Sequence, residues 1–372
     1  MSGQKKVIVC GGGVIGSSIG YYLTKKGAAV TLIERCEIAC GASGKAGGFL
    51  AKDWSDSNPS LGKLSRKSFD LHVELSKTLK KDVGFRFLDT KSIVVSESPK
   101  KKQDLPDWVD GPIRSQSDIG SNKTTAQVHP HLFTHALVEA AKENGLKVHI
   151  GVVENIIWEG QVAKGVKLFG SDQIMEADAI VIAMGPWSHL AHQFLPDNVK
   201  KIFPLNDIIY GHKAHSIILD PKDKNKITAH ALFADYLKTD PEIYPRPDGT
   251  VYICGKAETV ELPEDPSKIV PKDEHCDFLV KFAGVVSSEL LNAQVKVKQA
   301  CYLPCSIGDG QPMIGAVPET KGLYIATGHS CWGILNAPAT GLLLSEVIME
   351  EKCSLNIDAF SPSRWVSRKL KK

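Results

Sequence analysis

A glycine-rich turn near the amino terminus constrains the fold of this chain more than any other feature. Residues 11–16 carry glycine at positions 11, 12, 13 and 16, and they directly follow the apolar run of residues 7–10. In a strand–turn–helix unit, Gly11 permits the tight turn and Gly13 lets the backbone approach a pyrophosphate. Gly16 allows the helix to pack closely against the strand. The pattern predicts a dinucleotide-binding turn.

The residues that follow the turn complete this unit. Residues 14–26 are expected to form a helix that Gly27 ends, with its first amides and partial positive charge facing the phosphates. Residues 30–33 are expected to form the next buried parallel strand, and Glu34 closes it. A carboxylate at that place can accept both ribose hydroxyls of a dinucleotide. The strand, the helix, the glycine that ends the helix and the acid all occur in the expected order and spacing, which a chance glycine turn would not explain.

Composition limits the classes of protein to consider. The 372 residues are 42% hydrophobic and 23% charged, which suits two globular domains or one sheet with a large insertion. A net charge of +3 is too small to indicate a nucleic-acid partner. No membrane span or signal peptide is recognised, so a cytoplasmic protein is expected. The separate basic clusters are interpreted as solvated helix ends and a tail: Lys63, Arg66, Lys67; Lys80, Lys81; Lys100, Lys101, Lys102; Arg368, Lys369, Lys371, Lys372.

The nine cysteines are odd in number and include no CxxC pair. In a reducing compartment they are expected to be mostly small, buried thiols. The pairs Cys36/Cys40 and Cys301/Cys305 share a three-residue gap, so a four-thiolate zinc site is formally conceivable. Neither pair sits on the knuckle turn that such sites need. Free thiols and no metal are therefore the favoured interpretation.

Hydrophobic periodicity predicts an alternation of helices and buried strands before residue 203. Leucines at helical spacing predict a helix over residues 61–81, and Pro130 opens a second helix that reaches residue 144. Residues 98–122 are polar and contain Pro and Gly, which is typical of a long excursion. The expected strands are residues 85–87, 92–95, 147–150 and 179–183.

The pattern changes between residues 203 and 297, where alternating segments separated by Pro, Asp and Gly predict an antiparallel sheet. Residues 322–327 then form another buried strand, followed by a helix over residues 337–349. The dinucleotide-binding domain is therefore expected to be discontinuous. The predicted division is residues 1–60, 123–202 and 300–360 for this domain, 61–122 and 203–299 for a substrate or cap domain, and 361–372 for a basic tail.

Four segments in this order resemble the FAD-dependent oxidoreductases of the D-amino acid oxidase type, which include glycine oxidase and sarcosine oxidase. They are residues 7–34, the small-residue loop 41–51, the strand and turn 180–187, and residues 309–315 with 322–341. The resemblance spans nearly the whole chain. It implies an α/β fold in which a discontinuous Rossmann-type FAD-binding domain accompanies an α+β substrate domain built on an antiparallel sheet.

The fourth segment also makes physical sense for a flavin. A second strand–turn–helix unit aims another helix amino terminus into the site, where its amides and dipole can stabilise negative charge on the N1–C2=O edge of a reduced flavin. A nicotinamide enzyme has no need of such an element. Coincidental glycines between a helix stop and a helix start are the alternative interpretation.

The resemblance implies a set of cofactor contacts. Val14, Ile15, Ala42 and Ser43 would lie at the phosphates, although Ser43 could be only a helix cap. Val153 would read the adenine, although it could be only a core residue. The remaining expected contacts are Gly11, Gly13, Gly16 and Gly185 in glycine turns; Glu34 and Arg35 around the adenosine ribose; Gly47, Gly48 and Phe49 at the isoalloxazine; and Gly328, His329, Ser330, Cys331, Trp332, Gly333 and Ile334 around the pyrimidine end.

The substrate side departs from the family pattern. The arginine that clamps a substrate carboxylate falls at Leu303, and the second polar anchor of glycine oxidase falls at Cys331. The sarcosine oxidase lysine falls at Leu335, and the lysine that helps some members react with oxygen falls near Ile253. Binding of a free α-amino acid in the usual way, and fast reaction with oxygen, are both in doubt.

Other side chains are candidates for the substrate pocket. Arg246 is either a substrate-recognition residue or a surface turn residue. A histidine in the position of His329 more often has a structural role than the role of a catalytic base. Tyr302 and Trp332 either form an aromatic wall over the flavin or belong to the core. The candidates are Phe49, Tyr244, Arg246, Tyr302 and Trp332, and no catalytic side chain is identified.

Cys301 occupies the place where sarcosine oxidases attach FAD covalently, but a proline follows closely, so non-covalent FAD is favoured. The leading hypothesis is oxidation of a C–N bond in an amine or amino-acid-like small molecule, with hydride transfer to flavin N5. The alternatives are a flavin dehydrogenase acting on a non-amino-acid substrate, and an FAD-loaded binding or regulatory protein with little turnover.

Overall fold

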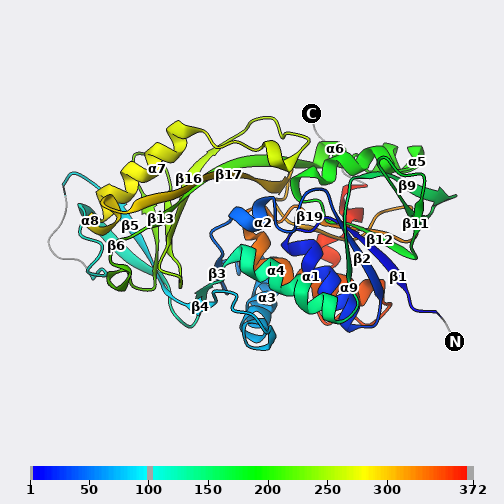
Figure 1. Cartoon of the computed structure of the whole chain (residues 1–372), viewed down its shortest axis with the longest axis horizontal. Coiled ribbons are helices and arrows are strands. Elements are labelled where there is room, and N and C mark those ends of the chain that lie inside the picture. Colours follow the sequence, from blue (N-terminus) through cyan, green and yellow to red (C-terminus); the bar gives the residue numbers. More distant parts are fainter. Residues whose placement is uncertain (1–2, 99–103, 367–372) are drawn as a thin grey trace.

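The computed structural model describes residues 3–98 and 104–366. Its two large sheets lie side by side, one parallel and one mostly antiparallel, and the long strands β13 (Ile209–Asp220) and β17 (Gln294–Ser306) extend from the second toward the first (Figure 1). The α/β fold predicted from the sequence is confirmed. The basic residues at 100–102 and 368–372 lie outside the described residues.

The parallel sheet has six strands in the order β18-β19-β12-β1-β2-β8. Only β18 runs antiparallel to its neighbour. The register places Val7 of β1 beside Val30 of β2 and Ala179 of β12. The strands predicted at residues 7–10, 30–33, 147–150, 179–183 and 322–327 all belong to this sheet. Their bounds are β18 Met313–Ala316, β19 Leu323–Thr327, β12 Ala179–Ile182, β1 Lys6–Cys10, β2 Ala29–Glu34 and β8 Lys147–Ile150.

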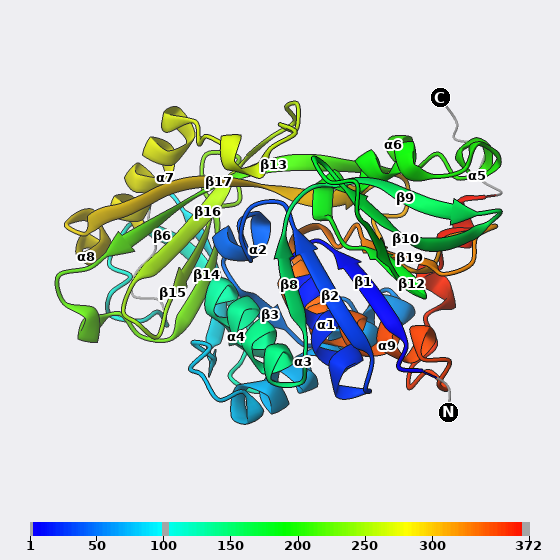
Figure 2. The ribbon, with the colours of Figure 1, turned by 45° about the vertical axis from the view of Figure 1, so that its right-hand side comes forward.

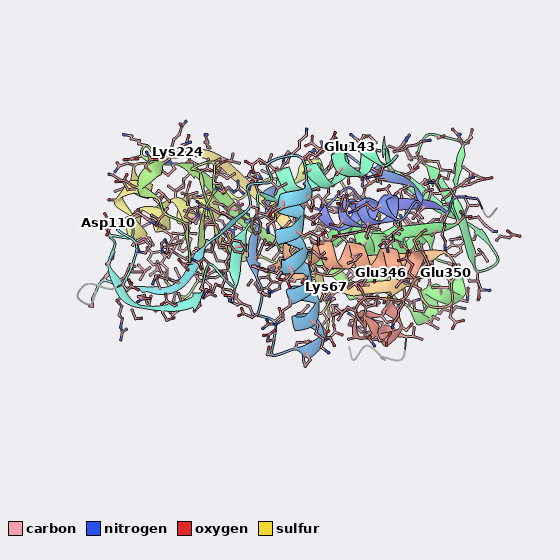
Figure 3. All side chains as sticks on the ribbon, turned by 90° about the horizontal axis from the view of Figure 1, so that it is seen from below. Lys67, Asp110, Glu143, Lys224, Glu346 and Glu350 are labelled. Atoms are coloured by element: carbon pink, nitrogen blue, oxygen red, sulfur yellow. A yellow bond between two sulfur atoms is a disulfide. The ribbon has the colours of Figure 1, made fainter. Side chains whose placement is uncertain are left out.

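Helices cover one face of this sheet, as Figure 2 shows for α1 and α4. A single apolar cluster joins the sheet to α1 (Val14–Lys25), α4 (Pro130–Glu143) and α9 (Gly333–Ile348). Helix α3 (Pro59–Thr78) packs on α9, and seen from below it crosses between the two halves of the molecule near Lys67 (Figure 3). The opposite face carries a second apolar cluster. It is covered by β9 (Val153–Glu159), β10 (Val162–Leu168), β11 (Ile174–Glu176), η1 (Gly185–Phe194), α5 (Asp197–Ile202) and α6 (Leu205–Ile208).

One stretch, Ser330–Ile348, is long and apolar enough to cross a membrane by length and composition, although the sequence was expected to contain none. It includes α9, and 72% of the stretch is buried inside the protein. Among the described residues no other helix passes the same test. Packing against the sheet and α1 therefore accounts for the apolar character of this helix.

The second large sheet has seven strands in the order β17-β13-β16-β15-β14-β5-β6. It is antiparallel as predicted except for β14 and β5, which pair in parallel. Helices α7 (Asp273–Val286) and α8 (Ser288–Leu291) share an apolar cluster with one face. The other strands are β16 Val251–Glu258, β15 Glu242–Pro245, β14 His230–Asp235, β5 Asp89–Val95 and β6 Ile113–Gly120. A three-stranded sheet of β3 (Phe49–Ala51), β7 (Thr125–Gln127) and β4 (Arg86–Phe87) lies between the two halves.

Two predicted elements differ from the structure. The stretch of residues 98–122 was expected to be an irregular excursion, but part of it forms the edge strand β6. That strand is polar because most of its side chains face solvent, so it carries no apolar alternation. Helix α9 begins at Gly333 and not at Ala337, and it contains Pro338 in its interior.

A hydrogen bond from another helix compensates for this proline. Pro338 has no N–H, so the carbonyl of Ile334, four residues earlier, lacks its usual helical partner. The Nε2 atom of His72 on α3 lies 2.9 Å from that carbonyl oxygen. Burial lowers the pKa of His72 to about 4, so the ring is neutral near pH 7 and Nε2–H is the donor. This bond ties α3 to the first turn of α9.

Candidate functional site

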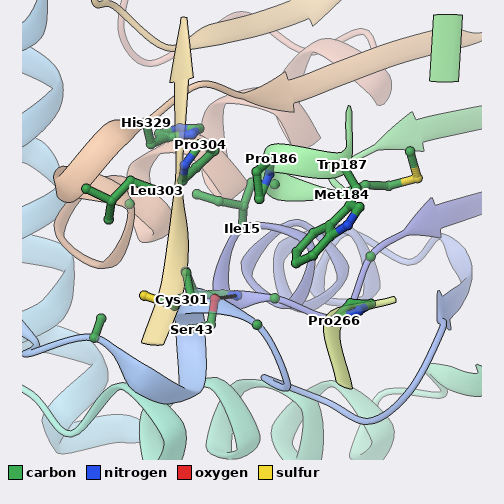
Figure 4. Close-up of a pocket in the computed structure, with 18 of the residues that line it drawn as sticks. Ile15, Ser43, Met184, Pro186, Trp187, Pro266, Cys301, Leu303, Pro304 and His329 are labelled. Carbon is green, nitrogen blue, oxygen red and sulfur yellow. Dashed lines mark hydrogen bonds between the residues drawn. The ribbon is translucent and has the colours of Figure 1, made fainter. Parts of the chain in front are cut away.

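A cavity of about 640 Å³ runs between the glycine turn after β1 and the inner face of the antiparallel sheet. Its volume is within the range of small-molecule and cofactor sites. Figure 4 shows Ile15, Ser43 and Trp187 around it, and Cys301 and Leu303 along β17. The cavity therefore joins the element that predicts a dinucleotide to the sheet that was expected to bind substrate.

The glycine turn meets the cavity as its sequence predicts. Gly11 has a φ of +116°, and a Cβ there would lie 2.3 Å from the carbonyl oxygen of Ala183, directly after the neighbouring strand β12. A Cβ on Gly16 would lie 2.0 Å from the carbonyl oxygen of Gly11. Only glycine fits these two positions, and together they let α1 begin at the cavity wall.

Ser43 closes the start of α1 from a neighbouring segment. The helix has no side-chain cap of its own, because its N-cap residue is Gly13. The backbone N–H of Val14 donates instead to the Oγ atom of Ser43, 2.8 Å away. Ser43 belongs to the short helix α2 (Ala42–Lys45), whose own N-cap is Gly41. The serine therefore caps α1, and it also lines the cavity.

The carboxylate of Glu34 is fixed at one end of the cavity. The backbone N–H of Gly12 donates to its Oε2 atom (2.6 Å), and the N–H of Cys36 donates to Oε1 (3.1 Å). Arg35 and Val153 line the same cavity. Two backbone amides thus orient a buried acceptor at the place where a ribose is expected.

The cysteines beside Glu34 differ from the expectation of free thiols. Cys36 and Cys40 are joined by a disulfide, because the intervening turn brings their Cα atoms to 6.6 Å. Cys301 and Cys305 lie on β17 as free thiols and do not join this pair in a ligand cluster. The described residues thus bring together no four-thiolate zinc site.

The other end of the cavity is formed by small residues and a second helix start. A Cβ on Gly47 would lie 2.5 Å from the ring of Tyr244, so this loop packs directly on the antiparallel sheet. Gly333 and Ile334, at the start of α9, line the cavity beside His329. A second helix amino terminus therefore faces the cavity, as the sequence predicts.

His329 lines this end of the cavity and carries a buried polar atom without a partner among the described residues. Its Nε2 atom lies 3.0 Å from the hydroxyl of Thr340, whereas its buried Nδ1 atom has no hydrogen-bond partner among the described residues. Burial lowers the pKa of His329 to about 3, so the imidazole is neutral and not a charged acid. A ligand in the cavity with a matching polar group would give this atom a partner.

Most of the predicted site residues do line the cavity. They are Gly11, Gly13, Val14, Ile15, Glu34, Arg35, Ala42, Ser43, Gly47, Gly48, Phe49, Val153, Gly185, Tyr244, His329, Ser330, Cys331, Trp332, Gly333 and Ile334. Gly16 supports the turn from behind, and Gly328 adopts the left-handed conformation that precedes His329.

Arg246 and Tyr302 are not among the residues that line the cavity. Arg246 begins a turn, because its carbonyl accepts the N–H of Gly249, but its side chain is buried. Its guanidinium lies over the ring of Tyr252 and donates to the carbonyl oxygen of Ala46 at 3.3 Å. Tyr302 faces the opposite side of β17 from Cys301, and its hydroxyl donates to the carbonyl oxygen of Glu261. The structure places both side chains behind the cavity wall.

A second contact joins the small-residue loop to the antiparallel sheet. The side-chain amide of Gln299 on β17 donates to the carbonyl oxygen of Lys45 and to the hydroxyl of Ser216, each at 3.1 Å. With the bond from Arg246 to Ala46, these contacts hold residues 45–46 from the sheet side. The loop that borders the cavity is therefore positioned by the antiparallel sheet.

Sequence reasoning missed several cavity-lining residues: Glu242, Phe233 and Cys254 on the antiparallel sheet, and Trp187 on η1. Glu242 lies on β15 two residues before Tyr244, so both side chains face the cavity. Phe233 and Cys254 are its cross-strand partners. The alternation of Glu242 and Tyr244 was visible in the sequence, but the pairing of three strands was not.

These features fit FAD. The glycine turn leaves space where Cβ atoms would stand, Glu34 is a fixed acceptor, and His329 offers an unpaired nitrogen at the far end. Two helix amino termini face the cavity, which suits a pyrophosphate at one and a negatively charged ring edge at the other. An extended dinucleotide with a polar ring system satisfies all of them.

Comparisons with known proteins agree. A sequence model of the family described as FAD dependent oxidoreductase matches residues 6–347. A putative oxidoreductase of Schizosaccharomyces pombe is 32% identical, and the alignment covers 97% of this chain and 99% of that protein. The crystal structure of glycine oxidase from Geobacillus kaustophilus superposes with a TM-score of 0.80 at 20% identity, covering 97% of this chain and 99% of that chain. L-proline dehydrogenase from P. horikoshii gives a TM-score of 0.80 at 20% identity, covering 98% of each chain. The chain belongs to the FAD-dependent oxidoreductase family, of the D-amino acid oxidase type.

Proposed function

We propose that this oxidoreductase oxidises a C–N bond of an amine or amino-acid-like small molecule. The observation that carries the proposal is the continuity of the cavity, which joins a cradle suited to FAD with an aromatic chamber on the antiparallel sheet. FAD supplies a hydride acceptor at N5. The proteins of similar fold are named glycine oxidase and L-proline dehydrogenase, and both names indicate substrates with an amine nitrogen.

In this proposal the chain binds and orients the substrate and excludes water, and no strong base is needed. Phe49, Tyr244 and Trp332 form apolar walls that hold an amine in a dry environment. His329 is neutral and its Nε2 atom is engaged with Thr340 inside α9, which suits a structural role beside the cofactor and not accepting a proton from the substrate. Hydride transfer from a neutral amine is consistent with this arrangement.

A dehydrogenase acting on a substrate other than an α-amino acid is the second candidate. Leu303 lines the cavity where a carboxylate-binding arginine was expected, and it offers no charge. Ile253, near which the oxygen-activating lysine of some family members would fall, is fully buried. Both observations favour a substrate without an α-carboxylate and an electron acceptor other than oxygen.

The proposed function predicts that substrate reduces the flavin. The purified yellow protein is mixed under anaerobic conditions with a panel of amines and amino acids, and the visible flavin absorption is followed. We expect at least one amine to bleach it and air or an added electron acceptor to restore the colour. If none bleaches it while dithionite does, the amine-oxidation proposal is wrong.

We propose that FAD is bound without a covalent link. Cys301 lines the cavity, and burial raises the pKa of its thiol to about 11, so the reactive thiolate is scarce near pH 7. Acid precipitation is expected to leave the yellow colour in the supernatant. Colour retained in the pellet, and lost from it in Cys301→Ala, would instead identify a thioether.

We also propose a division of the chain into two domains. We assign residues 1–60, 123–202 and 300–360 to the FAD-binding domain and residues 61–122 and 203–299 to the substrate domain. Sheet membership supports this division in outline, because strands of the parallel sheet come from both ends of the chain. Strand β17 spans the boundary at residue 300.

We also propose a cytoplasmic location for the protein.

A further inference from the structure

Glu242 places a carboxylate on the aromatic side of the cavity. It begins β15, where Phe233 on β14 and Cys254 on β16 lie beside it in register. All three residues line the cavity. An acid here is unexpected for a site that would recognise an α-amino acid, because the substrate carboxylate would meet a second negative charge.

Aromatic rings border the cavity around this acid. Phe49 lies 5.1 Å from Phe233 and 5.4 Å from Tyr244, measured between ring centroids. Trp332 belongs to the same apolar cluster and also lines the cavity. We call Phe49, Phe233, Tyr244 and Trp332 the aromatic cage. Faces of aromatic rings carry negative electrostatic potential and attract cations, most strongly when water is excluded.

No basic side chain among the described residues forms an ion pair with Glu242. Its Oε2 atom accepts hydrogen bonds from the hydroxyl of Tyr244 and from the thiol of Cys254, the latter at 3.3 Å. Burial raises the pKa of Glu242 above the usual value, and these two hydrogen bonds offset only part of the rise. The carboxylate is thus oriented by neutral donors but has no cation beside it.

Lys256 on β16 also lines the cavity, but its ammonium group and the guanidinium of Arg246, which follows β15, engage other partners. The ammonium of Lys256 lies 4.3 Å from the ring centroid of Phe278 on α7, which covers the outer face of the sheet. Gly255, with a φ of +139°, is the extra residue of a bulge in β16, opposite His215 and Ser216 of β13. This bulge turns Lys256 to the outer face. Arg246 is engaged with Tyr252 and the loop carbonyl of Ala46. Neither side chain therefore pairs with Glu242, and a bound ligand can supply the cation.

We propose that the cavity binds a cationic amine without a carboxylate beside its nitrogen, and that Glu242 pairs with the ammonium group inside the aromatic cage. Before oxidation the ammonium group would give its proton to the Glu242 carboxylate, so that the amine is neutral when its hydride leaves. This inference rests on the proposed oxidation of a C–N bond and names its substrate class. N-alkylated amines fit best, because an alkylammonium is weakly hydrated and presents a broad positive surface to aromatic rings. Leu303 and Cys331, which stand where the resemblance places the polar anchors of the family, line the cavity and offer no charged group to an α-carboxylate.

The test uses the FAD-loaded protein and two probes of similar size and opposite charge. Benzyltrimethylammonium has a permanent positive charge and no lone pair on nitrogen, so it binds without being oxidised; benzoate carries the negative charge. Binding is measured by calorimetry and by the change in the visible flavin spectrum. We expect the ammonium probe to bind and benzoate to bind at least tenfold more weakly.

Variants identify the residues responsible. Glu242→Gln keeps the shape of the side chain and is expected to weaken binding of the ammonium probe by about 10- to 100-fold, because a charge-assisted contact is lost. Phe233→Leu should weaken it by about threefold to tenfold through loss of one ring face. The matched control is Glu258→Gln on the same sheet, since Glu258 faces α7 with Lys213 and Lys272. It should bind the probe as the wild type does.

The results separate this inference from the proposed function. Equal binding of the ammonium probe by wild type and Glu242→Gln, each with full FAD content, would overturn the inference, as would tighter binding of benzoate. Amino acids that bleach the flavin equally well in Glu242→Gln would remove the inference and retain the oxidation of a C–N bond. Probe binding that depends on Glu242, without bleaching by any amine, would retain the cation site and remove the oxidation.

Discussion

Gly11→Ala is expected to leave a folded protein that loses most of its FAD. Alanine strains the backbone at a φ of +116°, and its Cβ would lie 2.3 Å from the carbonyl oxygen of Ala183 and 2.8 Å from the carbonyl carbon. These atoms belong to the main chain after β12, so they cannot swing aside. The turn must shift, and the amides at the start of α1 shift with it. Strain of about 1–3 kcal/mol corresponds to roughly 5- to 150-fold weaker FAD binding.

The measurement is the ratio of flavin to protein after gel filtration, followed by titration of the apoprotein with FAD. Gly27→Asn is the matched control, because Gly27 ends the same helix with a φ of +83° and no atom lies within 4 Å of a Cβ built there. This variant should retain FAD at the wild-type ratio. Full FAD content in Gly11→Ala would show that the turn does not determine cofactor binding.

His72→Leu is expected to destabilise the protein by about 1–3 kcal/mol, because it leaves the buried carbonyl of Ile334 without a donor. The leucine fills a similar space, so the loss of the hydrogen bond dominates. Since Ile334 lines the cavity, FAD binding should weaken as well. Chemical unfolding followed by far-UV circular dichroism gives the free energy of unfolding, and flavin content is measured in parallel.

Pro338→Ala should rescue this variant. An alanine at position 338 restores the backbone N–H that can bond to Ile334, and it removes a helix-interior proline. We expect the substitution to stabilise His72→Leu by about 1–2 kcal/mol more than it stabilises the wild type, as a double-mutant cycle would measure. Equal effects in both backgrounds would mean that His72 does not replace the missing N–H.

The parallel half of the fold could be predicted from the sequence because its determinants are local. The glycines at 11 and 16 are required by contacts within one strand–turn–helix unit, and Glu34 closes the adjoining strand. A short stretch of sequence therefore carries both the turn and its chemistry. The second helix start near His329 was likewise visible in its own glycine-rich segment.

The substrate wall could not be predicted in the same way. Glu242, Phe233 and Cys254 meet only because β14, β15 and β16 pair in one register, and no single segment records that pairing. Tyr302 is aromatic and next to Cys301, yet the alternation of β17 turns it away. The start of α9 was missed because His72, more than 200 residues away in sequence, makes Pro338 tolerable inside the helix.

The bonds from Arg246 and Gln299 to the carbonyls of residues 46 and 45 have a thermodynamic consequence for both ligands. They attach the loop beside the cofactor cradle to the sheet that carries the aromatic cage. A ligand that orders the loop would therefore also restrict the sheet, and a ligand that orders the sheet would restrict the loop. Linkage requires that any coupling be reciprocal: the factor by which a substrate analogue tightens the hold on FAD equals the factor by which FAD tightens the hold on the analogue.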